Sequence, residues 1–114
     1  MPVLLNARTD TYLFRDPSAS DDDLLAETID RGRAYVQAGA DGLFVPGIAD
    51  QAAIAAICKA VTVPVNLMLG AEPVDLDELL RLGVRRLTCG PAFQLQAQQQ
   101  LQDTIASLPA PRQA

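Results

Sequence analysis

The sequence contains no histidine and only two cysteines. Without histidine the commonest general base and the commonest nitrogen ligand for metals are missing, which excludes His-containing catalytic triads and histidine zinc sites. Cys58 and Cys89 are too few for a disulfide framework. Because the chain also lacks a secretion signal, we expect both to be reduced thiols in a cytoplasmic protein.

Basic residues and long apolar runs are also scarce. Nine Lys and Arg stand against 14 Asp and Glu, which gives a net charge of −5 and disfavours nucleic acid and anionic membranes as partners. No apolar run approaches the roughly 18 residues of a transmembrane helix, and the N-terminus does not resemble a signal peptide. At 114 residues, 49% of them hydrophobic, the chain is expected to form at most one ordinary globular domain.

Short apolar runs alternate regularly with amphipathic stretches. The first helix is predicted to start at Ser20 and to bury the face that carries Leu25, Ile29, Gly32 and Val36. Each predicted strand precedes a helix. The first and third helices are predicted to end at Gly39 and Gly83 and the last at Leu108, with Asp50 and Asp75 as further N-caps. The strands are predicted over residues 2–7, 42–45, 65–69 and 86–89.

Repeated strand–helix units require parallel strands joined by right-handed crossovers. Eight such units close into a (β/α)8 TIM barrel of about 250 residues, so four units correspond to half a barrel. That half would have two open edge strands. A small open, doubly wound α/β sheet fits the same pattern. The sequence therefore predicts an α/β fold of four parallel βα units and leaves these two architectures open.

Functional side chains are expected where the strands end, because sites form there in both architectures. Arg8 follows the first strand and could hold a carboxylate or phosphate through two parallel hydrogen bonds, and Asp10 could either orient Arg8 or ligate a metal. An Arg8–Asp10 ion pair that only fixes the loop is the alternative. Asn66 lies in an otherwise apolar strand, so it either contacts a substrate or is a satisfied interior amide.

Other candidate residues have simpler structural explanations. Cys89 has no histidine to activate it, and Cys58 lies on the apolar face of a helix, so both are interpreted as packed thiols. Asp21, Asp22 and Asp23 fit the charged start of a helix better than a metal site. Gly90 and Pro91 lack the further glycines of a phosphate-binding loop.

Four segments together resemble the isocitrate lyase and phosphoenolpyruvate mutase superfamily, which includes proteins similar to 2-methylisocitrate lyase and carboxyvinyl-carboxyphosphonate phosphorylmutase. The segment Asn6-Ala7-Arg8-Thr9-Asp10 resembles the family's ARTD segment. The other three, in matching order, are residues 38–47 (AGADGLFVPG), 63–68 (VPVNLM) and 82–91 (LGVRRLTCGP).

The resemblance implies that residues 1–108 are strands five to eight of a (β/α)8 barrel, followed by a flexible tail over 109–114. It implies Mg²⁺-dependent chemistry on small carboxylates or 2-oxo acids, with Arg8 binding the substrate's carboxylate or phosphonate and Asn66 near a substrate-contacting position. In this family the last helices commonly exchange between subunits, which makes the helix over 92–108 a candidate for such packing.

The chain departs from the family pattern in what it lacks. The family's Mg²⁺-binding acids and gating loop lie mainly in the N-terminal half, and Pro46-Gly47 stands where the lyases have a glutamate. We therefore expect a truncated, C-terminal part of a lyase or mutase for C–C or P–C bonds, inactive alone and acting as a homo-oligomer or with its missing half. The alternative is a non-catalytic half-barrel that self-associates or binds a small anionic metabolite.

Overall fold

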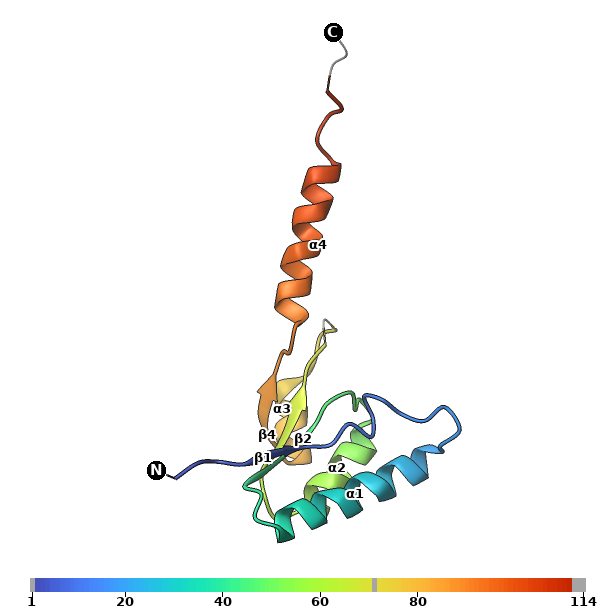
Figure 1. The fold of residues 1–114 in the computed structure, drawn as a ribbon, viewed down its shortest axis with the longest axis vertical. Helices are drawn as coiled ribbons and strands as arrows, with labels where there is room; N and C mark the ends of the chain where they lie inside the picture. The colour runs from blue at the N-terminus through green and yellow to red at the C-terminus, as the bar shows by residue number, and fades with distance from the viewer. Residues whose placement is uncertain (1, 71, 112–114) are drawn as a thin grey trace.

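The computed structural model of this chain describes residues 2–70 and 72–111. Four strands alternate with four helices along the chain (Figure 1). They are β1 (Asn6–Arg8), α1 (Asp21–Gln37), β2 (Gly42–Val45), α2 (Gln51–Ala60), β3 (Val65–Met68), α3 (Leu76–Leu82), β4 (Val84–Thr88) and α4 (Ala92–Ala106).

The four strands form one parallel sheet in the order β1-β2-β3-β4. Each strand is added on the same side of the one before it, so right-handed crossovers place α1, α2 and α3 on one face of the sheet. A doubly wound sheet would reverse its strand order partway. The uniform order is that of a barrel wall, which confirms the expected four parallel βα units of a TIM-barrel-type fold.

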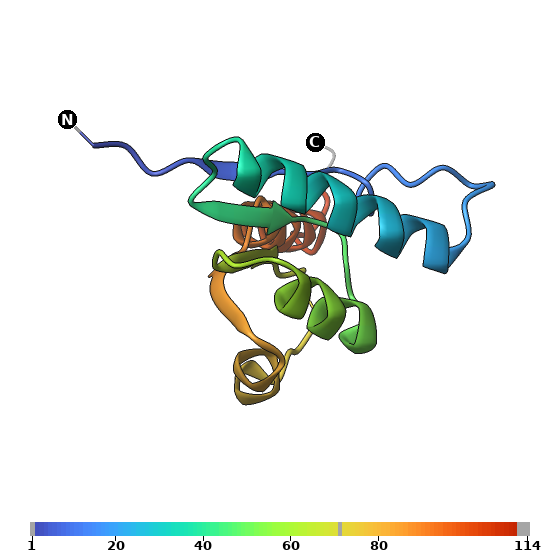
Figure 2. The ribbon, with the colours of Figure 1, turned by 90° about the horizontal axis from the view of Figure 1, so that it is seen from below.

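The core fills the space between the sheet and these helices. Leu43 and Val45 of β2 point into it and are fully buried. Gly32 brings α1 close to β2, because a Cβ at this position would lie 2.8 Å from Leu43 Cδ2. α1 and α2 lie side by side (Figures 1 and 2). The remaining buried apolar residues of this cluster are Ile48, Ala53, Ile54, Ile57, Val61, Val65, Leu67, Leu79 and Val84.

The predicted helix starts are confirmed by their capping hydrogen bonds. The side chains of Ser20, Asp50 and Asp75 each accept a hydrogen bond from the backbone N–H of the residue three positions later, at the starts of α1, α2 and α3. These bonds satisfy amides that no helical carbonyl can reach. The predicted buried face of α1 is shifted, because Leu24, Thr28 and Gly32 are buried. Leu25, Ile29 and Val36 are only partly buried.

The prediction of a buried strand over residues 2–7 is wrong. β1 spans only Asn6–Arg8, and the exposed fractions of Val3 and Leu4 are 83% and 85%. This segment is apolar, but in the described part of the chain it has no layer to pack against. Its end is held by Leu5, whose amide donates to Asp41 Oδ2 at 2.8 Å. The limits of β3 and β4 differ from prediction by one or two residues.

α4 points away from the sheet (Figure 1), and Figure 2 shows it end-on. It ends at Ala106, two residues before the predicted end, and none of its residues is buried. The radius of gyration is therefore 18.9 Å, against about 13 Å for a compact domain of this length. The tail predicted to be flexible, 109–114, has its last three residues outside the described ones.

Among the described residues, no helix combines the length and the apolar character needed to cross a membrane.

Candidate functional site

Arg8 and Asp10 come together where β1 ends. Arg8 Nε donates to Asp10 Oδ1 at 2.5 Å, and about half of the Arg8 side chain is exposed. The guanidinium carbon lies 5.7 Å from the centroid of the Phe44 ring, within cation–π range. Among the described residues the two terminal amino groups of Arg8 have no hydrogen-bond partner. They form a fork that suits a carboxylate or a phosphonate.

Four side chains form a row across the sheet. Arg8 pairs laterally with Phe44, Phe44 with Asn66, and Asn66 with Arg86. Lateral partners in a pleated parallel sheet project to the same face. The neighbouring residues Leu43 and Val65 face the helices, so this row lies on the opposite face. We call Arg8, Phe44, Asn66 and Arg86 the inner row.

A bulge in β4 decides which arginine joins the inner row. Val84 pairs with Val65 but Arg86 pairs with Asn66, so Arg85 is an extra residue in β4. Arg85 Nη1 donates to the carbonyls of Leu80 and Val84, both at 3.0 Å, on the α3 side. The predicted strand starts at Arg86, and the sequence did not identify Arg86 as a candidate, because the bulge that fixes its side is defined only by the register with β3. Two adjacent arginines inside a strand were the signal available.

Asn66 lies on the same face as Arg8 but in a more buried place. Its side chain is 3% exposed, and its Oδ1 has no hydrogen-bond partner in the described part of the chain. It lines a cavity of about 200 Å³ together with Asn6, Asp41 and Arg86, all near the amino ends of the strands. The structure thus places Arg8 and Asp10 in contact and Asn66 on the same sheet face, in a cavity that does not include them.

A second cavity, of about 520 Å³, opens at the carboxyl ends of β2 and β3. Its walls are mainly apolar and include Gly47 and Met68 but not Arg8 or Asn66. Gly47 has a φ of +86°, and a Cβ there would lie 2.8 Å from the Leu13 backbone. The Pro46-Gly47 turn therefore brings the loops after β1 and β2 together without adding a carboxylate.

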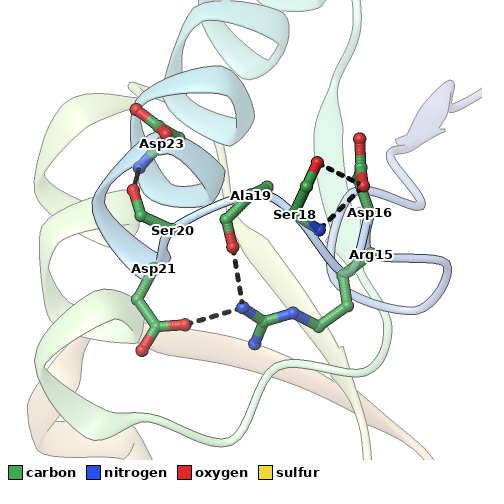
Figure 3. Close-up of polar contacts among 7 residues, drawn as sticks. All are labelled: Arg15, Asp16, Ser18, Ala19, Ser20, Asp21 and Asp23. Carbon is green, nitrogen blue, oxygen red and sulfur yellow. Dashed lines mark hydrogen bonds and ion pairs between the residues drawn. The ribbon is translucent and has the colours of Figure 1, made fainter.

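The acidic start of α1 is structural. Asp21 accepts from Arg15 Nη2 at 3.0 Å, and the Asp23 amide donates to Ser20 Oγ (Figure 3). Asp16 accepts from both the amide and the hydroxyl of Ser18, which lowers the pKa of its carboxyl below the usual range. Over residues 2–70 and 72–111, no three His, Cys, Asp or Glu side chains are grouped so that they could hold a metal ion.

The cysteines lie apart from the inner row. Cys58 packs against the turn at Gly83, where a Cβ would approach Cys58 Cβ to 2.8 Å. Burial raises the pKa of the Cys58 thiol, and the nearby Arg85 only partly opposes this. A neutral thiol is a poor nucleophile, so its surroundings favour a packing role.

Several known proteins are similar to this chain. An uncharacterized protein of Mycobacterium tuberculosis is 38% identical over 88 residues, which cover 77% of this chain and 32% of that protein. The oxaloacetate decarboxylase of Rhodopseudomonas palustris is 38% identical over 63 residues, or 55% of this chain and 21% of the enzyme. Among crystal structures, a "putative phosphonomutase" from Burkholderia cenocepacia is 44% identical, with a TM-score of 0.79 over 90% of this chain and 41% of that one.

The chain thus spans about a third or less of these curated relatives. The family model for phosphoenolpyruvate phosphomutase matches residues 1–108, which is nearly the whole chain. The solved neighbours have the barrel-type arrangement of parallel strands found here. By sequence and by structure, this chain belongs to the phosphoenolpyruvate phosphomutase family, within the isocitrate lyase and phosphoenolpyruvate mutase superfamily.

Proposed function

We propose that this chain is the substrate-anion-binding part of a lyase or mutase that acts on C–C or P–C bonds of small carboxylates or 2-oxo acids. The observation that carries the proposal is the Arg8 guanidinium at the end of β1. Its Nε is held by Asp10, and its two terminal amino groups are free of partners among the described residues. The name of the oxaloacetate decarboxylase relative supports a small carboxylate as the substrate class.

Each residue at this end of β1 has a separate role in binding. The terminal amino groups of Arg8 donate two parallel hydrogen bonds to a substrate carboxylate or phosphonate. Asp10 limits rotation of the guanidinium, and the Phe44 ring supports its face. Arg8 and Asp10 are therefore the substrate-binding pair of the proposal. Asn66 lies apart from this pair, in its own cavity. We propose that it binds substrate in the completed barrel.

Mg²⁺ is implied by the family, but the described residues do not fit it by themselves. Asp10 is already bound to Arg8, and no group of three potential ligands is present in residues 2–70 and 72–111. We therefore propose that residues outside this chain supply its ligands and that the chain alone is inactive. The completed protein is proposed to work in the cytoplasm as an oligomer.

The role of Arg8 can be tested in a completed barrel. A chimera would carry this chain in place of the segment that it matches in the oxaloacetate decarboxylase of Rhodopseudomonas palustris, with oxaloacetate decarboxylation as the assay. We expect Arg8→Ala to raise KM and to lower kcat/KM about a hundredfold or more, because a charge-assisted bidentate contact is lost. Arg8→Lys should recover only part of the loss, since an ammonium cannot form the same fork.

The matched control is Arg31→Ala, because Arg31 also forms an exposed ion pair, with Glu27 on α1. It should leave the kinetic constants unchanged. Near-normal kinetics of Arg8→Ala would remove Arg8 from the site.

A second candidate function is binding of a small anion without catalysis. The free fork of Arg8 favours it, because this fork belongs to the chain itself. Titration calorimetry of the isolated chain with pyruvate and with phosphate tests it. Binding that Arg8→Ala abolishes, in a chain that is inactive even within the chimera, would favour this function over the lyase or mutase.

A further inference from the structure

The inner face of the sheet has the features of a contact surface without its partner. Three helices cover the other face, α4 points away from the sheet (Figure 1), and β1 and β4 are both edge strands. Edge strands present unpaired backbone N–H and C=O groups, and parallel sheets are normally covered on both faces. Something else must therefore cover the inner row.

Two polar groups of the inner row indicate the chemistry of that partner. Arg86 forms no ion pair among the described residues, although β4 places it beside a nearly buried amide. The Oδ1 atom of that amide, on Asn66, is buried and has no hydrogen-bond donor in the same part of the chain. Covering this face would bury a cation and leave a carbonyl oxygen unsatisfied, and both are unfavourable unless the partner supplies complementary groups.

We propose that Arg86 and Asn66 form the closure contact for a second four-stranded half of the barrel, and that this half brings a carboxylate to Arg86 and a hydrogen-bond donor to Asn66. The proposal rests on the completed barrel of the proposed function. Relative length supports this occupant, since the chain accounts for only 41% of the solved Burkholderia cenocepacia protein. The sheet of this chain has four strands and two open edges, so it would form the other half of the barrel.

A second copy of this chain is a poorer partner on electrostatic grounds. In a closed ring of two copies, β4 of each would adjoin β1 of the other. Arg86 would then meet the edge that carries Arg8, whose one ion-pair partner among the described residues, Asp10, is already engaged. Like charges brought together at an interface are unfavourable. The proposed complement is therefore chemically different from this chain and carries a free carboxylate at the position that faces Arg86.

The chimera described above tests the contact, with structural readouts in place of activity. We expect amides of β1 and β4 to exchange with solvent at least tenfold more slowly in the chimera than in the isolated chain, because both edges become paired. Arg86→Met should lower the Tm of the chimera by about 5 °C or more, since it leaves the opposing carboxylate buried without a partner.

Arg85→Met is the matched control, because the neighbouring arginine lies on the α3 side of the bulge. Its effect on the Tm should be less than half that of Arg86→Met. An equal effect of the two variants would overturn the assignment of Arg86. A chimera that fails to fold, or whose edges exchange as fast as in the isolated chain, would overturn the closure contact.

Sedimentation of the isolated chain tests the other occupant. A dimer whose β1 and β4 amides are protected would show that a second copy covers this face, and it would overturn the proposal. The closure contact and the proposed function can also fail separately. Protected edges in an inactive chimera would count against the reaction alone, whereas an active chimera whose Tm is insensitive to Arg86→Met would count against the contact alone.

Discussion

Two arginines on the same face of the sheet differ in what holds them. Arg8 is fixed by Asp10 and by the ring of Phe44, whereas Arg86 has no charged partner in the described part of the chain. An exposed ion pair such as Arg8–Asp10 contributes about 0–1 kcal/mol to stability. Its value is therefore in orienting the guanidinium, and replacing either residue should affect binding more than folding.

Cys58 should react slowly with alkylating agents. Burial raises the pKa of its thiol, and only the thiolate attacks. In a Cys89→Ser background, we expect iodoacetamide to modify Cys58 more slowly in the folded chain than in the same chain unfolded by guanidinium chloride. The midpoint of the rate against pH should also lie above that of the unfolded thiol. Equal rates and midpoints would contradict a buried, neutral thiol.

The raised pKa of Cys58 also determines how this thiol makes the stability of the fold depend on pH. A pKa that is higher in the folded state means that folding favours the protonated thiol. The contribution is complete below the pKa of the unfolded thiol and is lost as the pH rises through the folded value. At neutral pH the Cys58 thiol therefore does not reduce stability.

At the scale of the element, two glycines end helices in similar conformations but in different surroundings. Gly39 has a φ of +110° with open space around its would-be Cβ, and Gly83 has a φ of +112° with Cys58 Cβ 2.8 Å away. Gly39→Ala should cost about 1 kcal/mol from backbone strain alone. Gly83→Ala should cost about 1–3 kcal/mol more, because the new methyl group also overpacks the contact.

Urea denaturation of both variants measures the difference. Because the backbone strain is nearly the same, Gly39→Ala serves as the control for Gly83→Ala. Equal losses of unfolding free energy would show that Cys58 moves aside without cost.

The elements that sequence reasoning located correctly are those specified by local chemistry. Ser20, Asp50 and Asp75 cap helices because each can accept a backbone N–H from its own first turn. The length of β1 and the face of the sheet on which Arg86 lies depend on distant partners. An apolar run has to pack against something to become a strand, and a bulge is defined only by the register with the neighbouring strand.

The same distinction applies to the candidate site, of which only the local part could be predicted from the sequence. The Arg8–Asp10 contact lies within three consecutive residues, so local sequence was enough to suggest it. The cavity around Asn66 and Arg86 is built from the starts of several strands and from the segment before β1. Its composition therefore depends on the arrangement of the whole sheet.

At the scale of the whole molecule, α4 contributes length without contributing to the core. None of its residues is buried, and Phe93, Leu95, Leu101 and Ile105 are exposed. A chain truncated after Pro91 should lose the helical circular dichroism of these 15 residues, while its Tm changes by about 2 °C or less. A large fall in Tm would show that α4 packs against the body of the same chain. The family's exchange of this helix between subunits stays a prediction.

The uniform strand order has a consequence for how the chain forms. Each strand pairs with the one that precedes it in sequence, about 20 to 40 residues away, so no pairing waits for a remote segment. Pairing between consecutive units closes shorter loops than pairing between the first and last strands would, which lowers the entropy cost of each step, and synthesis from the N-terminus delivers the units in the order in which they dock. The wall can therefore be laid down during translation, one strand–helix unit at a time, with the newest strand always serving as the template for the next.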